Sequence, residues 1–109
     1  MLATFEGAVR FNSDLSAWNP SNVETMESMF EFAASFNSDL GAWNVAKVQN
    51  ADNFLFLGTE FNQNLCAWGP QLAGNAAAVG DMFSGTFCPD QGVVNLGASP
   101  PGPFCFTCT

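Results

Sequence analysis

The chain has 109 residues, of which 48% are hydrophobic and 14% aromatic, so it is long and apolar enough for one small folded domain. Ten acidic residues against two basic ones give a formal net charge of −8, which excludes nucleic acid as a partner because no basic patch can bind phosphate, and which argues against docking on anionic lipid. No apolar run approaches the roughly 18 residues of a membrane-spanning helix, so membrane insertion is not expected.

One octapeptide occurs three times at a constant spacing: FNSDLSAW begins at Phe11, FNSDLGAW at Phe36 and FNQNLCAW at Phe61. The same spacing relates Phe5 to Phe30, which lie outside the octapeptide. A fourth, imperfect copy around residues 82–83 follows an insertion of three residues near LAGNAAA. Repeats of this length are typical of proteins in which each repeat stacks on the next.

Each repeat predicts a short strand followed by a helical or irregular return. Around Trp18 the apolar residues are two apart, which is typical of a strand, and from Val23 they are three and four apart, which is typical of a helix. Ser21 and Glu24 form a capping box that would begin this helix, and the counterpart in the next repeat is weaker. We predict parallel strands at about 17–20, 42–45, 67–70 and 92–95.

These elements predict an α/β fold, namely a right-handed leucine-rich-repeat solenoid of about four coils with short parallel strands. Equivalent side chains of successive coils would lie about 4.8 Å apart. Trp18, Trp43 and Trp68 should then form one buried ladder, and the Phe residues that begin the octapeptides should form another. An exposed Trp platform that stacks on sugar rings is the alternative, and we favour the core role.

Two polar columns run through the octapeptides: Asn12, Asn37 and Asn62 form one, and Asp14, Asp39 and Asn64 form the other. These side chains could coordinate calcium between coils, or they could bond the backbone at the turn before each strand. The third copy replaces Asp by Asn, which removes a charge, and no Gly accompanies the acids. We therefore favour the backbone role and expect no metal and no cofactor.

The pattern FNxDLxxWNVxxVxxMxxMFxxAxxFN over residues 1–87 resembles the 25-residue leucine-rich repeats of the bacterial surface protein A type, which also occur in mycoplasma lipoproteins and in algal and protist proteins. The chain departs from that pattern at Pro20 and Pro70, where Val is usual, and at Gly69, where Asn is usual. The resemblance implies a surface or secreted binding or adhesion protein without catalytic residues. Residues 88–109 resemble the ending that follows such arrays in algal proteins.

The two ends of the array differ. Residues 88–109 predict a Cys- and Pro-rich cap after coils at 1–87. The candidates for disulfides are Cys66, Cys88, Cys105 and Cys108, which allow three complete pairings. Zinc binding is the alternative, but the chain has no His, so we expect a disulfide-stapled cap in an oxidising compartment. At the other end Met1 takes the place in its repeat that Met26 takes in the next, so we expect the sequence to begin within a coil, as a piece of a longer protein.

An enzyme is not expected, because the chain has no His and no Tyr and a Cys nucleophile would lack its usual partner. We predict a non-enzymatic protein–protein interaction or adhesion module that is extracellular or on the cell surface and whose partner is another protein. The alternative is an architectural accessory subunit, docked on the extracytoplasmic or lumenal face of a larger membrane assembly in an oxidising lumenal compartment.

The predicted partner-binding face consists of small, uncharged residues that would point outward beside each Trp: Ala17, Asn19, Ala42, Asn44, Ala67 and Gly69. Such a face would bind by shape, with an affinity that depends weakly on salt. The alternative is an acidic face formed by Glu24, Glu27 and Glu31, on which a basic partner would bind in a salt-sensitive way.

Overall fold

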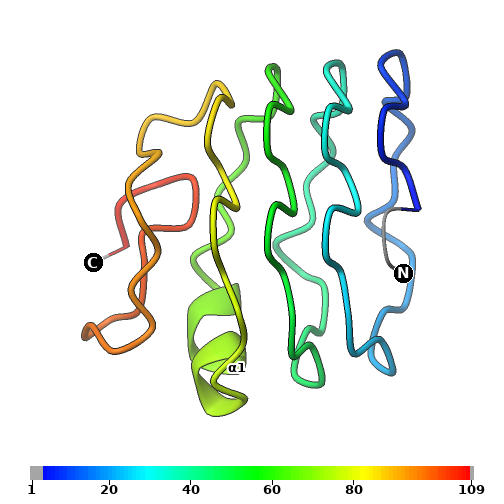
Figure 1. Cartoon of the computed structure of the whole chain (residues 1–109). Coiled ribbons are helices and arrows are strands. Elements are labelled where there is room, and N and C mark those ends of the chain that lie inside the picture. The colour runs from blue at the N-terminus through cyan, green and yellow to red at the C-terminus, as the bar shows by residue number, and fades with distance from the viewer. Residues whose placement is uncertain (1–3, 109) are drawn as a thin grey trace.

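A computed structural model describes residues 4–108. The chain winds through successive turns, which we call coils, and these lie side by side from the N-terminal to the C-terminal end (Figure 1). Within residues 4–108 there is one helix, α1 (Trp68–Gly74), and no strand. Parallel pairing is confined to isolated bridges that join Thr25 to Asn50 and Asn50 to Ala78. The predicted α/β leucine-rich-repeat solenoid is therefore wrong, because its strands and its repeated helices are missing from this part of the chain.

Backbone hydrogen bonds join neighbouring coils at every second residue, with N···O distances of 2.7–2.9 Å. In one coil the N–H groups of Met26, Ser28, Phe30 and Phe32 donate, in that order, to the carbonyls of Asn50, Asp52, Phe54 and Phe56. In the next coil those of Ala51, Asn53, Leu55 and Leu57 donate to the carbonyls of Ala78, Gly80, Met82 and Ser84. In the second set, donor and acceptor are three residues further apart in the sequence than in the first. These additional residues fall in the segment that contains α1, which confirms the insertion inferred near LAGNAAA.

Left-handed backbone at fixed positions of each coil accompanies this pairing. One column of such residues is Ser28, Asn53 and Asp81, with φ of 52–57°, and another is Gly7, Phe32, Leu57 and Gly85, with φ of 58–77°. Between these positions the chain makes tight turns. Each is closed by an N–H group that donates to the carbonyl three residues earlier, as Met29 does to Met26 at 3.1 Å. A helix or a strand needs similar dihedral angles at every residue, so the alternation excludes both.

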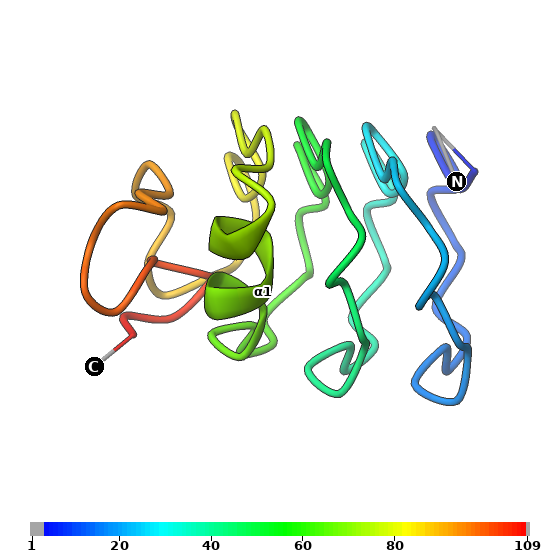
Figure 2. The ribbon, with the colours of Figure 1, turned by 90° about the horizontal axis from the view of Figure 1, so that it is seen from below.

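The predicted helix from Val23 is absent for this reason. Its apolar spacing of three and four residues comes from the tight turns, in which an N–H group bonds the carbonyl three residues earlier, and not from a helix. The capping-box residues Ser21 and Glu24 accordingly precede no helix. The strands expected beside each Trp are also missing, and the third of those segments forms the start of α1. Figure 2 shows α1 next to the C-terminal tail and the loops of the other coils in a row.

The core contains two of the three predicted Trp residues. Trp43 and Trp68 are 2% and 0% exposed, and their ring centroids lie 6.4 Å apart with 9° between the planes. The indole N–H groups donate to the carbonyls of Leu15 and Leu40, respectively, at 2.9 Å. Each Trp thus bonds the coil before it, so the ladder contributes hydrogen bonds as well as apolar burial.

The predicted Phe column is confirmed. Phe36 lies 5.8 Å from Phe11 and 6.1 Å from Phe61, measured between ring centroids, and the planes differ by 13° and 12°. Phe30 stacks on Phe36 within one coil at 4.0 Å. Aromatic rings therefore fill the core along the stack, as well as within each coil.

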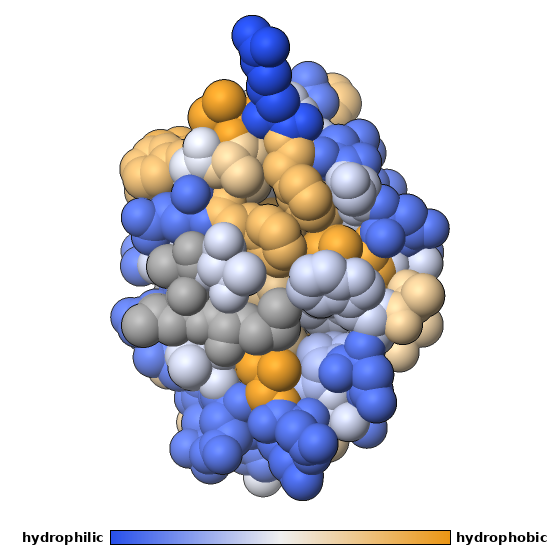
Figure 3. All heavy atoms as spheres, turned by 90° about the vertical axis from the view of Figure 1, so that its right-hand side faces the viewer, coloured by the Kyte–Doolittle hydropathy of each residue, from blue (hydrophilic) through white to orange (hydrophobic). Residues whose placement is uncertain are grey.

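Trp18 departs from the predicted ladder, because 46% of its side chain is exposed. It lies in the first coil of the described chain, at the end of the stack. Phe5 contacts its ring at 5.8 Å, and none of residues 4–108 accepts a hydrogen bond from its indole. Figure 3 looks onto this end and shows apolar side chains gathered over its middle, within a hydrophilic rim. The expectation about Met1 lies outside the described residues.

Two disulfides, Cys66–Cys108 and Cys88–Cys105, tie the C-terminal tail to the last coils, which confirms the predicted staple. Together they use all four cysteines, so no thiolate is left for zinc. The strand expected at 92–95 is absent from the tail, which instead forms isolated antiparallel bridges. The boundary placed between residues 87 and 88 stays a prediction.

We predict that Trp43→Ala lowers the free energy of unfolding by about 3–5 kcal/mol, because it removes a fully packed ring and the hydrogen bond that its indole N–H donates to the Leu15 carbonyl. Trp18→Ala is the matched control, since it changes the same position of the repeat where the ring is half exposed. Its loss should be less than half as large. Urea unfolding measures both, and equal losses would show that the Trp column is not part of the core.

Candidate functional site

The small residues predicted to form a binding face are exposed in the first two coils. Ala17 and Ala42 lie in tight turns at the surface. Asn19 and Asn44 are also exposed, and each Oδ1 accepts the backbone N–H two residues further on, at 3.1 and 3.0 Å. The oxygen of each side chain therefore stabilises its own turn. The side-chain NH₂ groups are the polar groups that remain for a partner.

The third coil does not continue this face. Ala67 is exposed at the N-cap of α1, but Gly69 is buried in that helix. A Cβ atom at Gly69 would lie 3.0 Å from the carbonyl oxygen of Pro101 and 3.2 Å from the ring of Phe104. The expectation that Gly69 points outward is wrong, because the C-terminal tail packs against it.

Of the acidic residues Glu24, Glu27 and Glu31, the last two lie in turns, Glu24 lies in irregular backbone, and none is on a helix. Glu24 is exposed, whereas Glu27 and Glu31 are half-buried. One coil further on, Asp52 takes the place of Glu27, and its Oδ1 accepts the N–H of Gly80 at 2.6 Å. The Asp52 carboxylate therefore has a structural role. The carboxylates that remain for a partner are those of the coil that carries Glu24, Glu27 and Glu31.

The two polar columns bond the backbone, as the sequence predicted, but in different ways. Asn12 and Asn37 accept, through Oδ1, the N–H of the equivalent Asn in the next coil, each at 2.8 Å, and so form a ladder between coils. Asp14, Asp39 and Asn64 each accept the N–H two residues further on at 2.9 Å, which closes a turn within one coil. Both roles need an oxygen acceptor and neither needs a metal ion.

Asp14 lies in a polar hollow of about 400 Å³ that also contains Asp39. Hydrogen bonds from the side chain and the backbone of Ser16 hold the pKa of the Asp14 carboxyl below its usual range, and Ser38 adds a weaker bond. The carboxylate therefore stays ionised while its oxygen is occupied by the turn. Within residues 4–108 no group of three or more His, Cys, Asp or Glu side chains is placed to hold a metal ion.

An exposed apolar strip, formed by Phe32, Phe56 and Leu57, is the feature that sequence reasoning missed. Phe32 and Leu57 are 43% and 37% exposed, and both have left-handed backbone, with φ of 61° and 58°. Phe56 is half-buried and its ring meets that of Phe32 at 6.1 Å. The signal in the sequence was Gly7 and Gly85, which occupy the same column and are the residues that left-handed backbone favours.

A family model described as "Mycoplasma protein of unknown function, DUF285" matches residues 1–93. Neither a curated protein nor a solved structure matches the chain. In the part of the chain that the structure describes, no helix is long and apolar enough to cross a membrane.

We predict that Asn37→Ala lowers the free energy of unfolding by about 1–3 kcal/mol, because the ladder loses an acceptor for the Asn62 N–H and for the Gln63 side chain. Asp39→Asn should change stability little, since an Asn at the equivalent position 64 accepts the same turn bond. Thermal unfolding with and without calcium measures both. A melting temperature that calcium raises in the parent but not in Asp39→Asn would restore the calcium interpretation.

Proposed function

The chain belongs to the DUF285 family, and we propose that it is a non-enzymatic module that binds another protein through the apolar strip of Phe32, Phe56 and Leu57. The observation that carries this proposal is the exposure of Phe32 and Leu57 on left-handed backbone. The coils on either side satisfy the same backbone geometry with Gly7 and Gly85. A large apolar side chain at this position therefore serves something other than the turn itself.

The energetics of folding disfavour these two residues. A side chain with a Cβ atom costs about 1–2 kcal/mol in the left-handed region relative to the right-handed one, and Gly avoids this cost. Phe32 and Leu57 gain little net stability, because 43% and 37% of these residues remain exposed and burial of the rest only about offsets this cost. Strained residues cluster at functional sites, and exposed aromatic side chains are frequent anchors of protein interfaces. Both properties support a binding role for the strip.

The charges beside the strip indicate the chemistry of the partner. Glu31 precedes Phe32, and Glu60 follows Leu57 by three residues and is exposed. With a net charge of −8 on the whole chain, a partner surface with basic groups around an apolar pocket would associate fastest. Burial of the apolar side chains would supply the affinity, so salt should lower the association rate more than it raises the dissociation rate.

The two disulfides indicate an oxidising environment. Among oxidising environments, we propose a cell surface or a secreted protein for this module, as the resemblance to surface protein A repeats implies. An accessory subunit in an oxidising lumen remains the alternative. Both assign a protein partner, and they differ in whether the module is found with a membrane assembly.

The stability of two variants tests the strain argument. Phe32→Gly and Phe32→Ala both remove the ring, but only Gly relieves the left-handed backbone. We predict that the Gly variant is more stable than the Ala variant by about 1 kcal/mol, because Ala keeps the strain. Urea unfolding measures the difference. If the Ala variant is as stable as the Gly variant, or more stable, Phe32 is not strained and the argument fails.

Binding tests the function itself. Proteins captured on the immobilised parent and on variants can be quantified by mass spectrometry. We predict that Phe32→Gly and Leu57→Gly remain folded and that each lowers capture of a partner of the parent at least about tenfold. Ala42→Arg, on the face predicted from the sequence, is the matched control and should keep that partner. Loss with Ala42→Arg and retention with both Gly variants would move the site to the small-residue face.

A further inference from the structure

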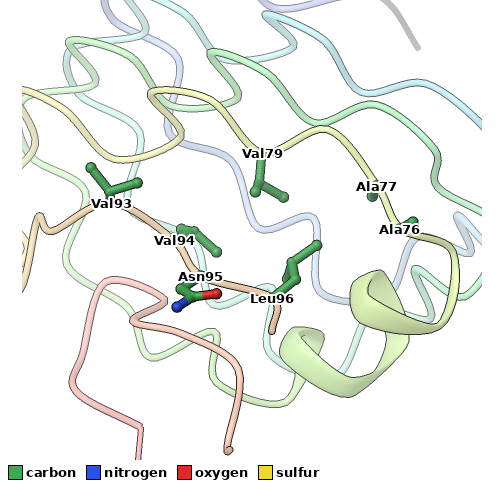
Figure 4. A pocket seen from close by; sticks show the side chains of 7 residues that line it. All are labelled: Ala76, Ala77, Val79, Val93, Val94, Asn95 and Leu96. Carbon is green, nitrogen blue, oxygen red and sulfur yellow. The ribbon is translucent and has the colours of Figure 1, made fainter. Parts of the chain in front are cut away.

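Two hollows border the C-terminal tail, and one of them contains a reactive bond. The larger hollow is an open cavity of about 630 Å³ between the last coil and residues 93–96 of the tail (Figure 4). Its lining side chains are apolar apart from Asn95, and none of them is reactive. The smaller hollow, of about 400 Å³, is lined by Asn64, Cys66, Ala67 and Pro70 and, from the tail, by Pro100, Thr107 and Cys108. The Cys66–Cys108 disulfide therefore lies in the wall of a hollow that opens to solvent.

The two disulfides differ in their access to solvent. Cys88 and Cys105 are 5% and 0% exposed and belong to the hydrophobic core. Cys66 and Cys108 are both half-buried and lie against that core from outside. Thiol–disulfide exchange needs access of a thiolate to a sulfur atom, so burial protects the Cys88–Cys105 bridge. The Cys66–Cys108 bridge lacks this protection.

The two cysteines of the accessible bridge are held differently. The N–H of Cys66 donates to Oδ1 of Asn64 at 2.9 Å, and its carbonyl accepts the N–H of Gly69 at 3.1 Å. The backbone of Cys108 makes no hydrogen bond to any of residues 4–108. Cys108 can therefore move as the bonding at its sulfur changes, whereas Cys66 stays in place.

We propose that the Cys66–Cys108 bridge is an exchange site for a low-molecular-weight thiol, which it retains as a mixed disulfide. The thiolate of the small molecule attacks Sγ of Cys108 and forms a new S–S bond there. The bond to Cys66 breaks, and Sγ of Cys66 leaves as a thiolate that takes up a proton from water. One disulfide is lost and one is formed, so no oxidant or reductant is consumed. The expelled Cys66 thiol stays in the same hollow and can reverse the reaction by attack on Cys108.

The surroundings of the bridge indicate which small thiols react fastest. None of the residues that line the hollow is charged, and its volume is in the range of small-molecule sites. Asp90 lies close by, since its Oδ2 accepts the hydroxyl of Thr107, next to Cys108, at 2.8 Å. The N–H of Gly92 and, to a smaller extent, this hydroxyl hold the pKa of the Asp90 carboxyl below its usual range, so the carboxylate stays ionised. Together with the net charge of −8, it favours a thiol that carries a positive group.

Exchange at this bridge should leave the rest of the fold in place. Leu65 donates its N–H to the carbonyl of Phe104 at 3.2 Å, and Cys105 remains bonded to Cys88. The tail thus stays on the last coil up to residue 105. The inference goes beyond the proposed function, because neither the apolar strip nor its partner takes part in the exchange.

The test uses the full chain and cysteamine, a small thiol with an ammonium group. After a brief reaction iodoacetamide blocks the free thiols, and peptide mass spectrometry locates each adduct. We expect cysteamine on Cys108 and the iodoacetamide label on Cys66, at a rate at least about tenfold above that at Cys88 or Cys105. In the chain unfolded by urea, the two bridges should react at similar rates. Equal rates at the two bridges of the folded chain, or cysteamine mainly on Cys66, would overturn the proposal.

Charges on the wall of the hollow provide matched variants. Ala67 is exposed, lines the hollow and caps α1 without a side-chain bond, so a charged side chain should be tolerated there. Ala67→Glu should speed the reaction with cysteamine and Ala67→Lys should slow it, each by about two- to threefold at low salt.

The same changes one repeat earlier are the control. Ala42→Glu and Ala42→Lys alter the net charge equally at an exposed position of the preceding coil, and should change the rate much less. Phe32→Gly should react as the parent does, so failure of the strip and failure of the exchange site give different results. Equal effects of the charges at the two Ala positions would show that the rate follows net charge alone, which would contradict a reaction in the hollow.

Discussion

The hydrogen bonds that join every second residue of one coil to the next are the constraint on which the rest of the structure depends. They fix how many residues separate paired positions in neighbouring coils. Where this separation increases, the additional residues lie in the segment that contains α1. The N–H groups of alternate residues point to the next coil, and left-handed residues turn the backbone along the same stretches. The same pairing brings equivalent side chains together, which produces the stacked Trp and Phe rings and the Asn ladder.

Within residues 4–108 the stack has two ends at which these groups meet no further coil. At the C-terminal end the disulfide-bonded tail lies on the last coil, where Leu65 donates to the carbonyl of Phe104, but it offers no acceptor among residues 4–108 to the N–H of Val79. At the other end Trp18 remains half exposed. The surface of the stack also presents side chains that the pairing does not need, and Phe32 and Leu57 are two of the exposed apolar ones. Binding to another protein through these side chains is the function that we propose for this scaffold.

The sequence predicted those features that depend on residue columns. The period, the three-residue insertion and the burial of Trp43 and Trp68 follow from which residues recur, and the disulfides follow from four cysteines in a chain without His. The prediction from sequence failed where backbone dihedral angles determine the local structure. Ser28 and Phe32 are residue types that rarely adopt left-handed backbone, so apolar spacing of three and four was interpreted as a helix. The burial of Gly69 depends on the tail, which packs on it from a distant part of the sequence, and no local pattern reports such a contact.

Scalar couplings through hydrogen bonds test the pairing between coils most directly, because NMR detects them only between a donor nitrogen and the carbonyl carbon that it bonds. The structure predicts a coupling from the nitrogen of Met26 to the carbonyl carbon of Asn50. One coil further on, it predicts a coupling from the nitrogen of Ala51 to the carbonyl carbon of Ala78, and each series continues at alternate residues. Couplings between residues four apart over 23–34 would instead show a helix in each repeat and would contradict the account.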